Sequence, residues 1–557
     1  MAGVVIRRIL IGGLVLVVAI CTYPGALVVS LATLATPARD APAIPPGALP
    51  WLHVAHPPGA RPYIADEVGR LVLLHGATPA GLLEFGPGSE PLNPIDPAAY
   101  ADGRCPALNP SSKYPPLCRA DLQAMAALGF NSMRLPISWS VLEPRRGEFS
   151  QTLVDRIAQI VDWARDLRMY VIIDMHQNAF SHYVAPGDGV NLTYNSGAPS
   201  WATITDGFPS RALKSQRELN PAVFQATTNF WYDRDGIQDE YIAALAFVAR
   251  RFVSDSVVAG YGLYNEPWPG WNVSVGFDDL LLFPFYRRVI DAITSVHDGL
   301  PCWSGFFMPA VCGYRDLGVG DRRHLMFLDT GLPREITDFP THLGMPVSSY
   351  PNLVLGLHAY THIYTPDKLV LGQNPRDATY PWGGYDQSYA LAEREAKAMR
   401  AALFVEEFGN NSEDDDVVLA AQVLEQEKHT IGFEFWTWKE KGGGAWGVFE
   451  PAIPCLRTAR ERLLARVYPL QTSDLGVRFH YEPSDGSFIL RASGRTGDPE
   501  TVVYLPHEVT GPVSADGAVQ INVIDEAGGN RLVLASPTGG DFSIAVSPAP
   551  LRLSGCG

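Results

Sequence analysis

The sequence Gly-Tyr-Gly-Leu-Tyr-Asn-Glu-Pro-Trp at residues 260–268 joins a short apolar run to a carboxyl group. The run predicts a buried strand, and Asn265 and Glu266 stand at its carboxyl end. A second segment, Leu403–Gly409, has the same design and carries Glu407 at its end. Because the carboxyl ends of the strands form the active face of a parallel barrel, the two segments predict two carboxyl groups on one face.

The rest of the chain supports a barrel, because eight short apolar segments alternate with amphipathic helical segments. The predicted strands are Leu71–Gly76, Asn131–Pro136, Tyr170–Met175, Gly260–Tyr264, Cys302–Phe307, Val354–His358, Leu403–Glu407 and Gly432–Trp436. The predicted helices include Ala120–Leu128, Thr152–Leu167, Asp239–Phe252, Phe285–Val296 and Tyr389–Ala401. Repeated βα units in this number favour a closed (β/α)8 TIM barrel of the α/β class over an open sheet.

One connection is much longer than the others. The segment Asn178–Gln238, between the third predicted strand and its helix, exceeds a simple βα loop. Loops of this size at the carboxyl face of a barrel usually shape the substrate cleft. Its aromatic side chains either line a sugar or lipid site or pack the loop against itself: Trp201, Phe208, Phe230, Trp231 and Tyr232.

From about Ser473 onward, short alternating segments separated by turns replace the βα pattern. The predicted strands are Val477–Tyr481, Ser487–Arg491, Val502–Leu505, Val519–Val523, Arg531–Ala535 and Phe542–Ser547. They predict an antiparallel β-sandwich, which we interpret as a structural cap rather than a carbohydrate-binding module. The 557 residues then divide into an N-terminal segment 1–42, a Pro-rich linker 43–62, a barrel 63–470 and a C-terminal β-sandwich 471–557.

The N-terminal segment has the features of an export signal or a membrane anchor. Arg7 and Arg8 precede an apolar run from Ile9 to Ile20, and the apolar character continues as far as Leu34. This length suits either a cleaved signal peptide or an uncleaved membrane span. We therefore expect a secreted or cell-surface protein, with membrane anchoring through the N-terminus as the alternative to cleavage.

Six cysteines lie beyond this segment, and an even number in an exported chain favours disulfides over free thiols. The simplest pairing joins Cys105 to Cys118 and Cys302 to Cys312. A third bond, Cys455–Cys556, would then tie the C-terminus back to the end of the barrel. No spacing of these cysteines resembles a zinc site.

Composition and missing motifs exclude several classes of function. A net charge of −16 argues against a nucleic-acid partner. The sequence has no metalloprotease His pair, Walker A loop or serine nucleophile elbow. Residues 442–447 formally fit a dinucleotide-binding fingerprint, but they lie late in the chain with no helix immediately after them. We therefore predict no cofactor and no metal, a neutral substrate, and a monomer.

Two carboxyl groups on one barrel face suit glycoside hydrolysis with retention of configuration. In that reaction one carboxylate attacks the anomeric carbon and the other carboxyl protonates the departing oxygen, across about 5 Å. Mutual repulsion and partial burial keep one group protonated while the other stays ionised. The sequence thus predicts that Glu266 and Glu407 lie roughly 5 Å apart.

These motifs resemble glycoside hydrolase family 5, whose retaining β-glycosidases carry their acid/base and nucleophile on strands four and seven. The resemblance spans about Ile64–Tyr468 and implies that Glu266 is the acid/base. It implies that Glu407 is the nucleophile, because this residue directly precedes Phe-Gly. Since adjacent strand residues face opposite ways, Glu406 is expected to point away from the site. The substrate-binding residues that the resemblance implies are Arg134, His176, Asn265, His358, Tyr360 and Trp436.

Within the family the chain is most similar to the endoglycoceramidases, which cleave between the oligosaccharide and the ceramide of glycosphingolipids. The similar segments include Asp174–Gln177, Gly197–Trp201, Asn229–Trp231 and Asn265–Gly270. The resemblance implies a glycolipid or oligosaccharide substrate and allows contact with a membrane surface. A ceramide would need an apolar wall on the leaving-group side, for which the candidates are Phe435, Trp438, Trp446, Phe449 and Trp201.

Other functions stay open on the same barrel. One is an exo-acting β-glucosidase on glucosylceramide or steryl glucoside, and another is a cellulase-like endoglucanase. A third is an inactive carbohydrate-binding barrel, although such a protein would not need both Glu266 and Glu407.

Overall fold

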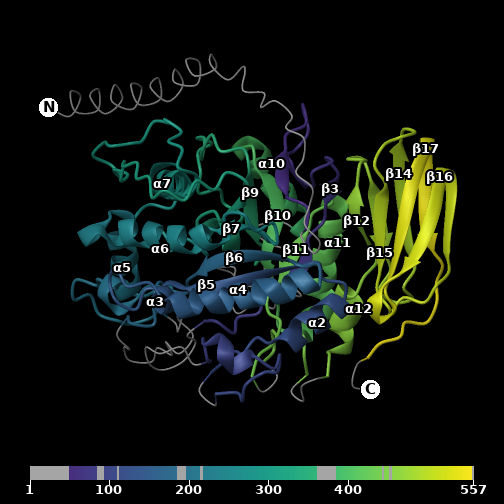
Figure 1. Ribbon diagram of the computed structural model, residues 1–557. Helices are drawn as coiled ribbons and strands as arrows, with labels where there is room; N and C mark the ends of the chain where they lie inside the picture. Colours follow the sequence, from purple (N-terminus) through teal and green to yellow (C-terminus); the bar gives the residue numbers. More distant parts are fainter. Residues whose placement is uncertain are drawn as a thin grey trace. The chain divides into compact units, whose positions relative to one another are not determined.

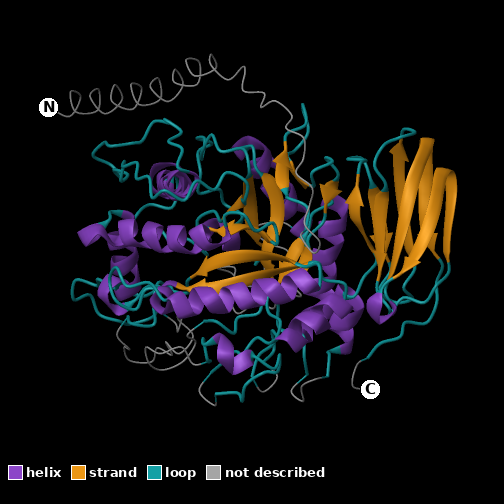
Figure 2. Cartoon of the chain, in the orientation of Figure 1, coloured by secondary structure: helices purple, strands orange, loops and turns teal. Residues whose placement is uncertain are grey.

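The computed structural model describes residues 49–83, 93–109, 112–184, 196–213, 217–360, 384–441, 444–450 and 455–554. These residues form a closed parallel barrel and an antiparallel sheet (Figure 1 and Figure 2). The predicted N-terminal segment 1–42 lies outside the described residues. Within the described ranges, no helix combines the length and apolar character needed to cross a membrane.

The barrel closes in the strand order β10-β11-β4-β5-β6-β7-β8-β9, and every neighbouring pair is parallel. Its strands are β4 (His75–Ala77), β5 (Ser132–Ser138), β6 (Tyr170–His176), β7 (Val258–Gly262), β8 (Leu325–Leu328), β9 (Leu353–His358), β10 (Ala402–Phe408) and β11 (Phe433–Phe435). All residues of these strands are buried, as expected for strands covered on both faces. The predicted TIM-barrel fold is confirmed.

Helices follow the strands around the barrel, and Figure 1 shows α4 and α6 beside β5 and β6. In chain order they are α2 (Arg119–Ala127), α3 (Trp139–Leu142), α4 (Gln151–Asp166), α5 (Pro221–Trp231), α6 (Ile237–Phe252), α7 (Phe283–Thr294), α8 (Leu332–Thr337), α10 (Tyr385–Met399), α11 (Ala420–His429) and α12 (Thr458–Leu464). In α4, the Ser150 hydroxyl accepts from the backbone N–H of Leu153 and caps the helix. The buried residues of α4 recur at helical spacing and pack against the barrel.

The structure corrects two predicted strands. Cys302–Phe307 forms no strand, and the fifth barrel strand is β8 instead. The aromatic composition of that segment resembles a strand, but a disulfide to Cys312 closes it into a loop. The predicted strand Leu71–Gly76 is divided, because Leu71–Val72 forms β3 of the antiparallel sheet and only His75 and Gly76 belong to β4.

The long connection after β6 contains a helix and contributes to the core. Helix α5 begins after Asn220, whose side chain accepts from the backbone N–H of Ala222. Phe230 and Trp231 are buried against other aromatic rings, so core packing explains both of them. Of the other aromatic residues predicted to line a site, Trp201 packs edge-on against Trp139, Tyr232 is half-buried and Phe208 is exposed.

The antiparallel sheet has the order β1-β2-β3-β12-β15-β17-β14-β13, and β16 also pairs with β17. Its strands are β1 (His53–Ala55), β2 (Tyr63–Ala65), β3 (Leu71–Val72), β12 (Tyr468–Thr472), β13 (Arg478–Tyr481), β14 (Phe488–Gly494), β15 (Thr501–Leu505), β16 (Val513–Asp525) and β17 (Arg531–Val546). One half of β17 pairs with β15 and the other half with β14, and apolar side chains from both halves share one core. The predicted antiparallel C-terminal domain is confirmed, although its strands belong to one hydrogen-bonded sheet and the last two predicted strands are merged in β17.

Three strands of this sheet precede the barrel in the chain. Strands β1, β2 and β3 pair in order, and β3 pairs with β12 after the barrel. The range 43–62, predicted as a linker, therefore contains β1, and the predicted barrel range 63–470 begins with β2 and β3. The hydrophobic pattern could not assign these strands to the sheet, because each has only two or three residues and β12, which joins them to the rest of the sheet, lies beyond the whole barrel.

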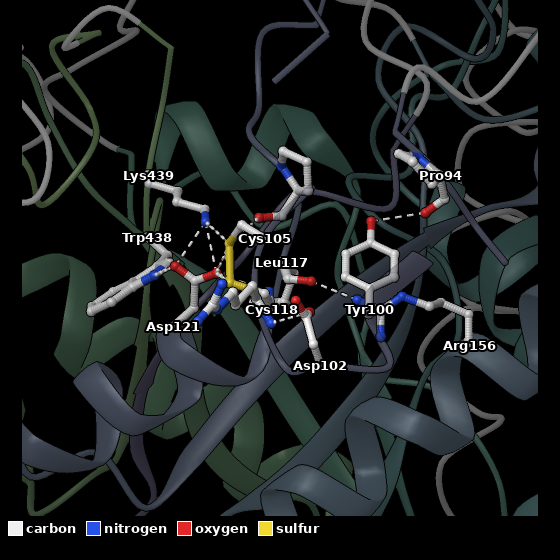
Figure 3. Close-up of a disulfide and its surroundings, with 12 residues drawn as sticks. Pro94, Tyr100, Asp102, Cys105, Leu117, Cys118, Asp121, Arg156, Trp438 and Lys439 are labelled. Atoms are coloured by element: carbon white, nitrogen blue, oxygen red, sulfur yellow. Dashed lines mark hydrogen bonds and ion pairs between the residues drawn. A yellow bond between two sulfur atoms is a disulfide. The ribbon is translucent and has the colours of Figure 1, made fainter. Parts of the chain in front are cut away.

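Two of the predicted disulfides, Cys105–Cys118 and Cys302–Cys312, are present. The third predicted pair, Cys455–Cys556, includes a residue outside the described ranges. Figure 3 shows Cys105–Cys118 beside Asp121, where Lys439 Nζ donates to both oxygens of that carboxylate at 2.7 Å. Because Asp121 lies in the first turn of α2, this ion pair attaches α2 to the segment after β11, and the disulfide attaches the start of α2 to the chain that precedes it.

Removing the Cys105–Cys118 disulfide in the double variant Cys105→Ala/Cys118→Ala should lower the free energy of unfolding by about 3 kcal/mol. The bond joins residues 13 positions apart and constrains the unfolded chain. Urea denaturation followed by circular dichroism measures the change. Cys302→Ala/Cys312→Ala opens a loop of similar length, with a sequence separation of 10, and by the same argument should lower the free energy of unfolding by a similar amount. An unchanged midpoint in the first variant would contradict a stabilising role for the Cys105–Cys118 bond.

Candidate active site

Glu266 follows β7 and is held through its backbone. Its φ of 45° is in the left-handed region, which is unfavourable for a residue with a side chain. The backbone N–H of Glu266 donates to Asp329 Oδ2 at 2.8 Å. Gln177 Nε2 donates to the carbonyl oxygens of Asn265 and Glu266 at 2.7 and 3.0 Å. These contacts offset the backbone strain and fix where the Glu266 side chain begins.

Glu407 lies near the end of β10 and is held through its carboxylate. Arg134 Nη1 donates to Glu407 Oε2 at 2.6 Å, and the Tyr360 hydroxyl donates to Oε1 at 2.7 Å. Both oxygens therefore accept a hydrogen bond, one of them from a cation. Charge-assisted bonds of this kind stabilise an ionised carboxylate and fix its orientation.

The two carboxyl groups face each other across a short distance. An oxygen of Glu266, an oxygen of Glu407 and a ring nitrogen of His358 all lie within 4.8 Å of one another. This spacing is that of a retaining pair at about 5 Å, and it is too short for the 6.5–9.5 Å of an inverting pair. Burial raises the pKa of Glu266, which favours its protonated form. The geometry therefore places a carboxyl group whose protonated form is favoured opposite a second carboxyl group that accepts a hydrogen bond from a cation.

Arg134 is the cation around which the site is organised. It extends from β5, is fully buried and donates Nη2 to Asn265 Oδ1 at 2.7 Å as well as Nη1 to Glu407. Nη2 also lies 3.0 Å from Asp174 Oδ2. Burial alone would lower the pKa of Arg134, but the surrounding carboxyls of Asp174, Glu406 and Glu407 raise it well above its usual value. The guanidinium thus stays charged and links three strands.

His176 and Trp436 form a flat wall beside the pair. The two rings stack with centroids 5.4 Å apart and planes 4° from parallel. His176 Nδ1 lies 2.9 Å from Asp174 Oδ2, and its Nε2 lies 3.1 Å from Asn178 Nδ2. The peptide bond after Trp436 is cis. The ring of His176 is therefore held on both edges while its face packs on the indole.

His358 lies between the two carboxyl groups. Its Nδ1 is 3.2 Å from Glu266 Oε1 and 4.0 Å from Glu407 Oε2. Burial lowers the pKa of His358 to about 3, so the imidazole is neutral. A neutral ring can exchange a hydrogen bond with Glu266 without changing the charge of the site.

The structure brings together all the residues that the sequence places in the site: Arg134, His176, Asn265, Glu266, His358, Tyr360, Glu407 and Trp436. The prediction for Glu406 was wrong, because its Oε1 accepts from Arg134 Nε at 3.1 Å instead of facing away. The pairing of β10 with β9 shifts register between Phe404 and Glu407, so strict alternation of side chains does not hold there.

The predicted apolar wall is largely core. Trp438 is fully buried and packs on Phe449, and Phe435 is also fully buried. Trp446 is half-buried, and its ring centroid lies 6.0 Å from that of Tyr360. Trp201 also has a packing partner, Trp139. Trp446 is the member of the predicted set that contacts a residue of the site, Tyr360.

The buried carboxyls inside the barrel were not predicted as part of the site. Asp329 follows β8, the strand that was misplaced, and Glu434 lies on β11, where Ser132 Oγ donates to it at 2.6 Å. Asp174 lies inside a quoted motif, but its contact with Arg134 depends on the neighbouring strand. An acidic residue within an apolar strand is the signal that could have identified Glu434 and Glu406.

A closed parallel barrel with two facing carboxyls at its carboxyl end defines the class of the protein as a barrel glycoside hydrolase. The family model "Cellulase (glycosyl hydrolase family 5)" matches residues 111–442, more than half of the chain. The chain belongs to glycosyl hydrolase family 5.

Relatives and solved structures agree with this assignment. The chain is 24% identical to endoglycoceramidase I of Rhodococcus hoagii (strain 103S) over 466 residues, which cover 80% of this chain and 78% of that protein. It superposes on the crystal structure of an endogalactoceramidase with a TM-score of 0.67 and 25% identity, covering 90% of this chain and 100% of the other. A ganglioside GM3 complex of endo-glycoceramidase II from Rhodococcus sp. has a TM-score of 0.65 at 21% identity, with 87% and 99% of the chains covered.

Proposed function

We propose that this protein is an endoglycoceramidase, a retaining glycosidase that hydrolyses the bond between the oligosaccharide and the ceramide of glycosphingolipids. The observation that carries the proposal is the pair Glu266 and Glu407, held within 4.8 Å in a chain similar to endoglycoceramidases over most of its length. The exo-acting and cellulase-like alternatives differ from it in their products, which the experiment below separates.

In the proposed reaction, a carboxylate oxygen of Glu407 attacks the anomeric carbon while Glu266 transfers its proton to the departing ceramide oxygen. The carbon–oxygen bond to ceramide breaks, and a covalent glycosyl ester on Glu407 forms. Glu266, now a carboxylate, removes a proton from water as the water attacks the same carbon. The ester bond breaks, the oligosaccharide leaves with retained configuration, and both carboxyls return to their first state.

The remaining residues of the site suit recognition of one sugar ring. We place the sugar next to the nucleophile and against the ring of Trp436, which stacks on His176. Asn265 Oδ1 accepts from Arg134, and Asn265 Nδ2 donates to the Gln177 carbonyl at 2.8 Å, so the orientation of the Asn265 amide group is fixed. Arg134 and Tyr360 act on the substrate through the orientation of Glu407.

Exposed apolar residues near Glu266 support contact with a lipid or membrane surface. The loop after Glu266 exposes 49% of Trp271, and the loop after α8 exposes 68% of Leu343. The two loops are joined, because the backbone N–H of Gly276 donates to the Thr341 carbonyl at 2.8 Å. Exposed apolar side chains on two connected loops, one of which follows the proton donor, are suited to contact with the leaving lipid.

Product analysis on a glycolipid with several sugars tests the proposed function. Incubation with ganglioside GM3 in detergent micelles should release an intact oligosaccharide and free ceramide in one step, detected by mass spectrometry. The Glu407→Gln variant is the matched control for contaminating activity. Stepwise release of terminal monosaccharides would refute endo action, and hydrolysis of cellulose without hydrolysis of glycolipid would refute the lipid substrate.

The rate of glycosyl transfer should fall as pH rises through the raised pKa of Glu266, because the proton donor is then lost. The measurement is kcat/KM against pH on a glycolipid and on an aryl β-glycoside whose leaving group departs without protonation. The alkaline decline should be present with the glycolipid and absent, or much weaker, with the aryl glycoside. Identical alkaline limbs on both substrates would contradict the proton-donor role of Glu266.

We also propose that the protein acts outside the cytosol as a secreted or surface-anchored monomer. The export features of residues 1–42 and the two described disulfides support this placement. N-terminal sequencing of the mature protein distinguishes a cleaved signal from a retained anchor.

A further inference from the structure

Two more buried carboxyl groups lie beside the catalytic pair. Glu406 is on β10 and Asp329 follows β8, and neither side chain is more than 3% exposed. An oxygen of each lies within 4.8 Å of the other and of a ring nitrogen of His358. Neither residue belongs to the site that the family resemblance assigns.

Glycines on the neighbouring strands make room for the Glu406 carboxyl. A Cβ atom on Gly356 of β9 would lie 1.9 Å from Glu406 Oε2 and 3.0 Å from Asp329 Oδ1. A Cβ atom on Gly262 of β7 would lie 3.1 Å from Glu406 Oε1. Any larger residue at Gly356 would displace the carboxyl. The fold therefore provides a position in which Glu406 Oε2 and Asp329 Oδ1 meet.

Hydrogen bonding at this position is complete only if one proton is shared. Burial raises the pKa of Glu406 to about 7, while the hydrogen bond that its Oε1 accepts from Arg134 Nε favours the ionised form. Glu406 Oε2 is buried and has no donor among the described groups. Asp329 Oδ2 accepts from the backbone N–H of Glu266, which leaves Oδ1 for the shared position. A proton on Asp329 Oδ1 would supply the missing donor to Glu406 Oε2.

The surrounding charges favour a single negative charge on the two carboxyls. Burial and the nearby carboxyl of Glu406 raise the pKa of Asp329 well above its usual value. Among the groups that face these two carboxyls, Arg134 is the cation. Its positive charge is shared with the carboxyls of Glu407 and Asp174, which it also contacts. The other titratable groups come from five neighbouring elements and are neutral or acidic: Asp174 of β6, Tyr286 of α7, Glu335 of α8, His358 of β9 and Glu434 of β11.

We propose that Asp329 and Glu406 share one proton and that this carboxyl pair positions both catalytic residues. Asp329 holds the backbone of Glu266, and Glu406 orients Arg134, which in turn holds Glu407. Both are positioning residues, because their contacts are to protein groups of the site. The inference rests on the proposed roles of Glu266 and Glu407 and is independent of the lipid substrate.

Amide substitutions test the shared proton. In Asp329→Asn, the amide donates to Glu406 as the acid would, and in Glu406→Gln, Asp329 ionises and accepts from the amide. Each single variant therefore keeps the hydrogen bond and the single negative charge, and each should lower kcat by about threefold. The double variant keeps no negative charge on this carboxyl pair, and its kcat should fall about a hundredfold, roughly ten times more than the product of the single effects. KM should change little in all three.

The measurements are kcat and KM on an aryl β-glycoside, together with the thermal midpoint of each variant. Asp329→Leu, which can neither donate nor accept, should lose far more activity than Asp329→Asn. A double variant equal to the product of the singles would overturn the proposal, as would folded single variants that each lose about a hundredfold or more. If the double variant does not fold, the kcat values of the two single variants and of Asp329→Leu test the proposal. Activity retained in Glu407→Gln would instead refute the catalytic assignment.

Discussion

Glu407→Gln should lower kcat by at least about a thousandfold, because the amide cannot form the glycosyl ester. The variant replaces one carboxylate oxygen with an NH2 group and keeps the size of the side chain. Its remaining oxygen can accept from Arg134 Nη1, and its NH2 group can donate to the Tyr360 hydroxyl, so the neighbouring side chains keep hydrogen-bond partners. Mass spectrometry of the protein quenched during turnover should detect the glycosyl ester in the native protein and not in the variant.

The adjacent glutamate is the matched control. Glu406→Gln changes the same functional group one residue away and should keep kcat within about tenfold. In Glu266→Ala, azide should restore part of the turnover on an aryl glycoside with a good leaving group, because the covalent step still proceeds and azide replaces the activated water. An inactive Glu406→Gln together with an active Glu407→Gln would show that the nucleophile is Glu406.

Arg134→Met should lower the free energy of unfolding by about 3–5 kcal/mol, because it leaves buried carboxylates without their cation. Arg134 is fully buried and contacts Asp174, Glu406 and Glu407 within 3.1 Å. Chemical denaturation gives the stability, and activity should be lost in the same variant because Glu407 loses its orientation. Addition of acid should partly restore stability, since protonated carboxyls no longer need the cation.

A surface arginine provides the comparison for this variant. Arg119 pairs with Asp166 at 2.8 Å while both side chains are about half exposed. Arg119→Met should change the free energy of unfolding by less than about 1 kcal/mol, because exposed ion pairs contribute little. Equal losses in the two variants would show that the interior charges do not depend on Arg134.

The sequence predicted most of the barrel because strand ends and helix faces are local patterns. Glu266 and Glu407 could be placed on one face since each stands at the end of an apolar run, and parallel strands end together. Cys302–Phe307 was misplaced because composition alone does not distinguish a strand from an aromatic loop. Strand β8, four residues of Leu, Met and Phe, was too short to stand out.

The contacts inside the site could not be predicted, because they depend on the register between neighbouring strands, which decides which residues lie side by side. Glu406 faces Arg134 at the place where the register of β10 shifts against β9. The space for its carboxyl comes from Gly356, a residue whose role is invisible until the pairing of the two strands is known. The predicted apolar wall for the lipid was wrong for Trp438, because the sequence does not show whether an apolar residue faces the core or the cleft, and Trp438 faces the core.

The pairing of β3 with β12 defines how the barrel is connected to the sheet. The backbone N–H of Leu73 donates to the Leu470 carbonyl at 3.1 Å, so the chain enters and leaves the barrel at adjacent points. In topological terms the catalytic barrel is an insertion within a β-domain, and close entry and exit points are what allow one domain to be inserted in another. Neither half of that β-domain is complete alone: truncation before β12 would expose β3 as an unpaired edge, a hazard for aggregation.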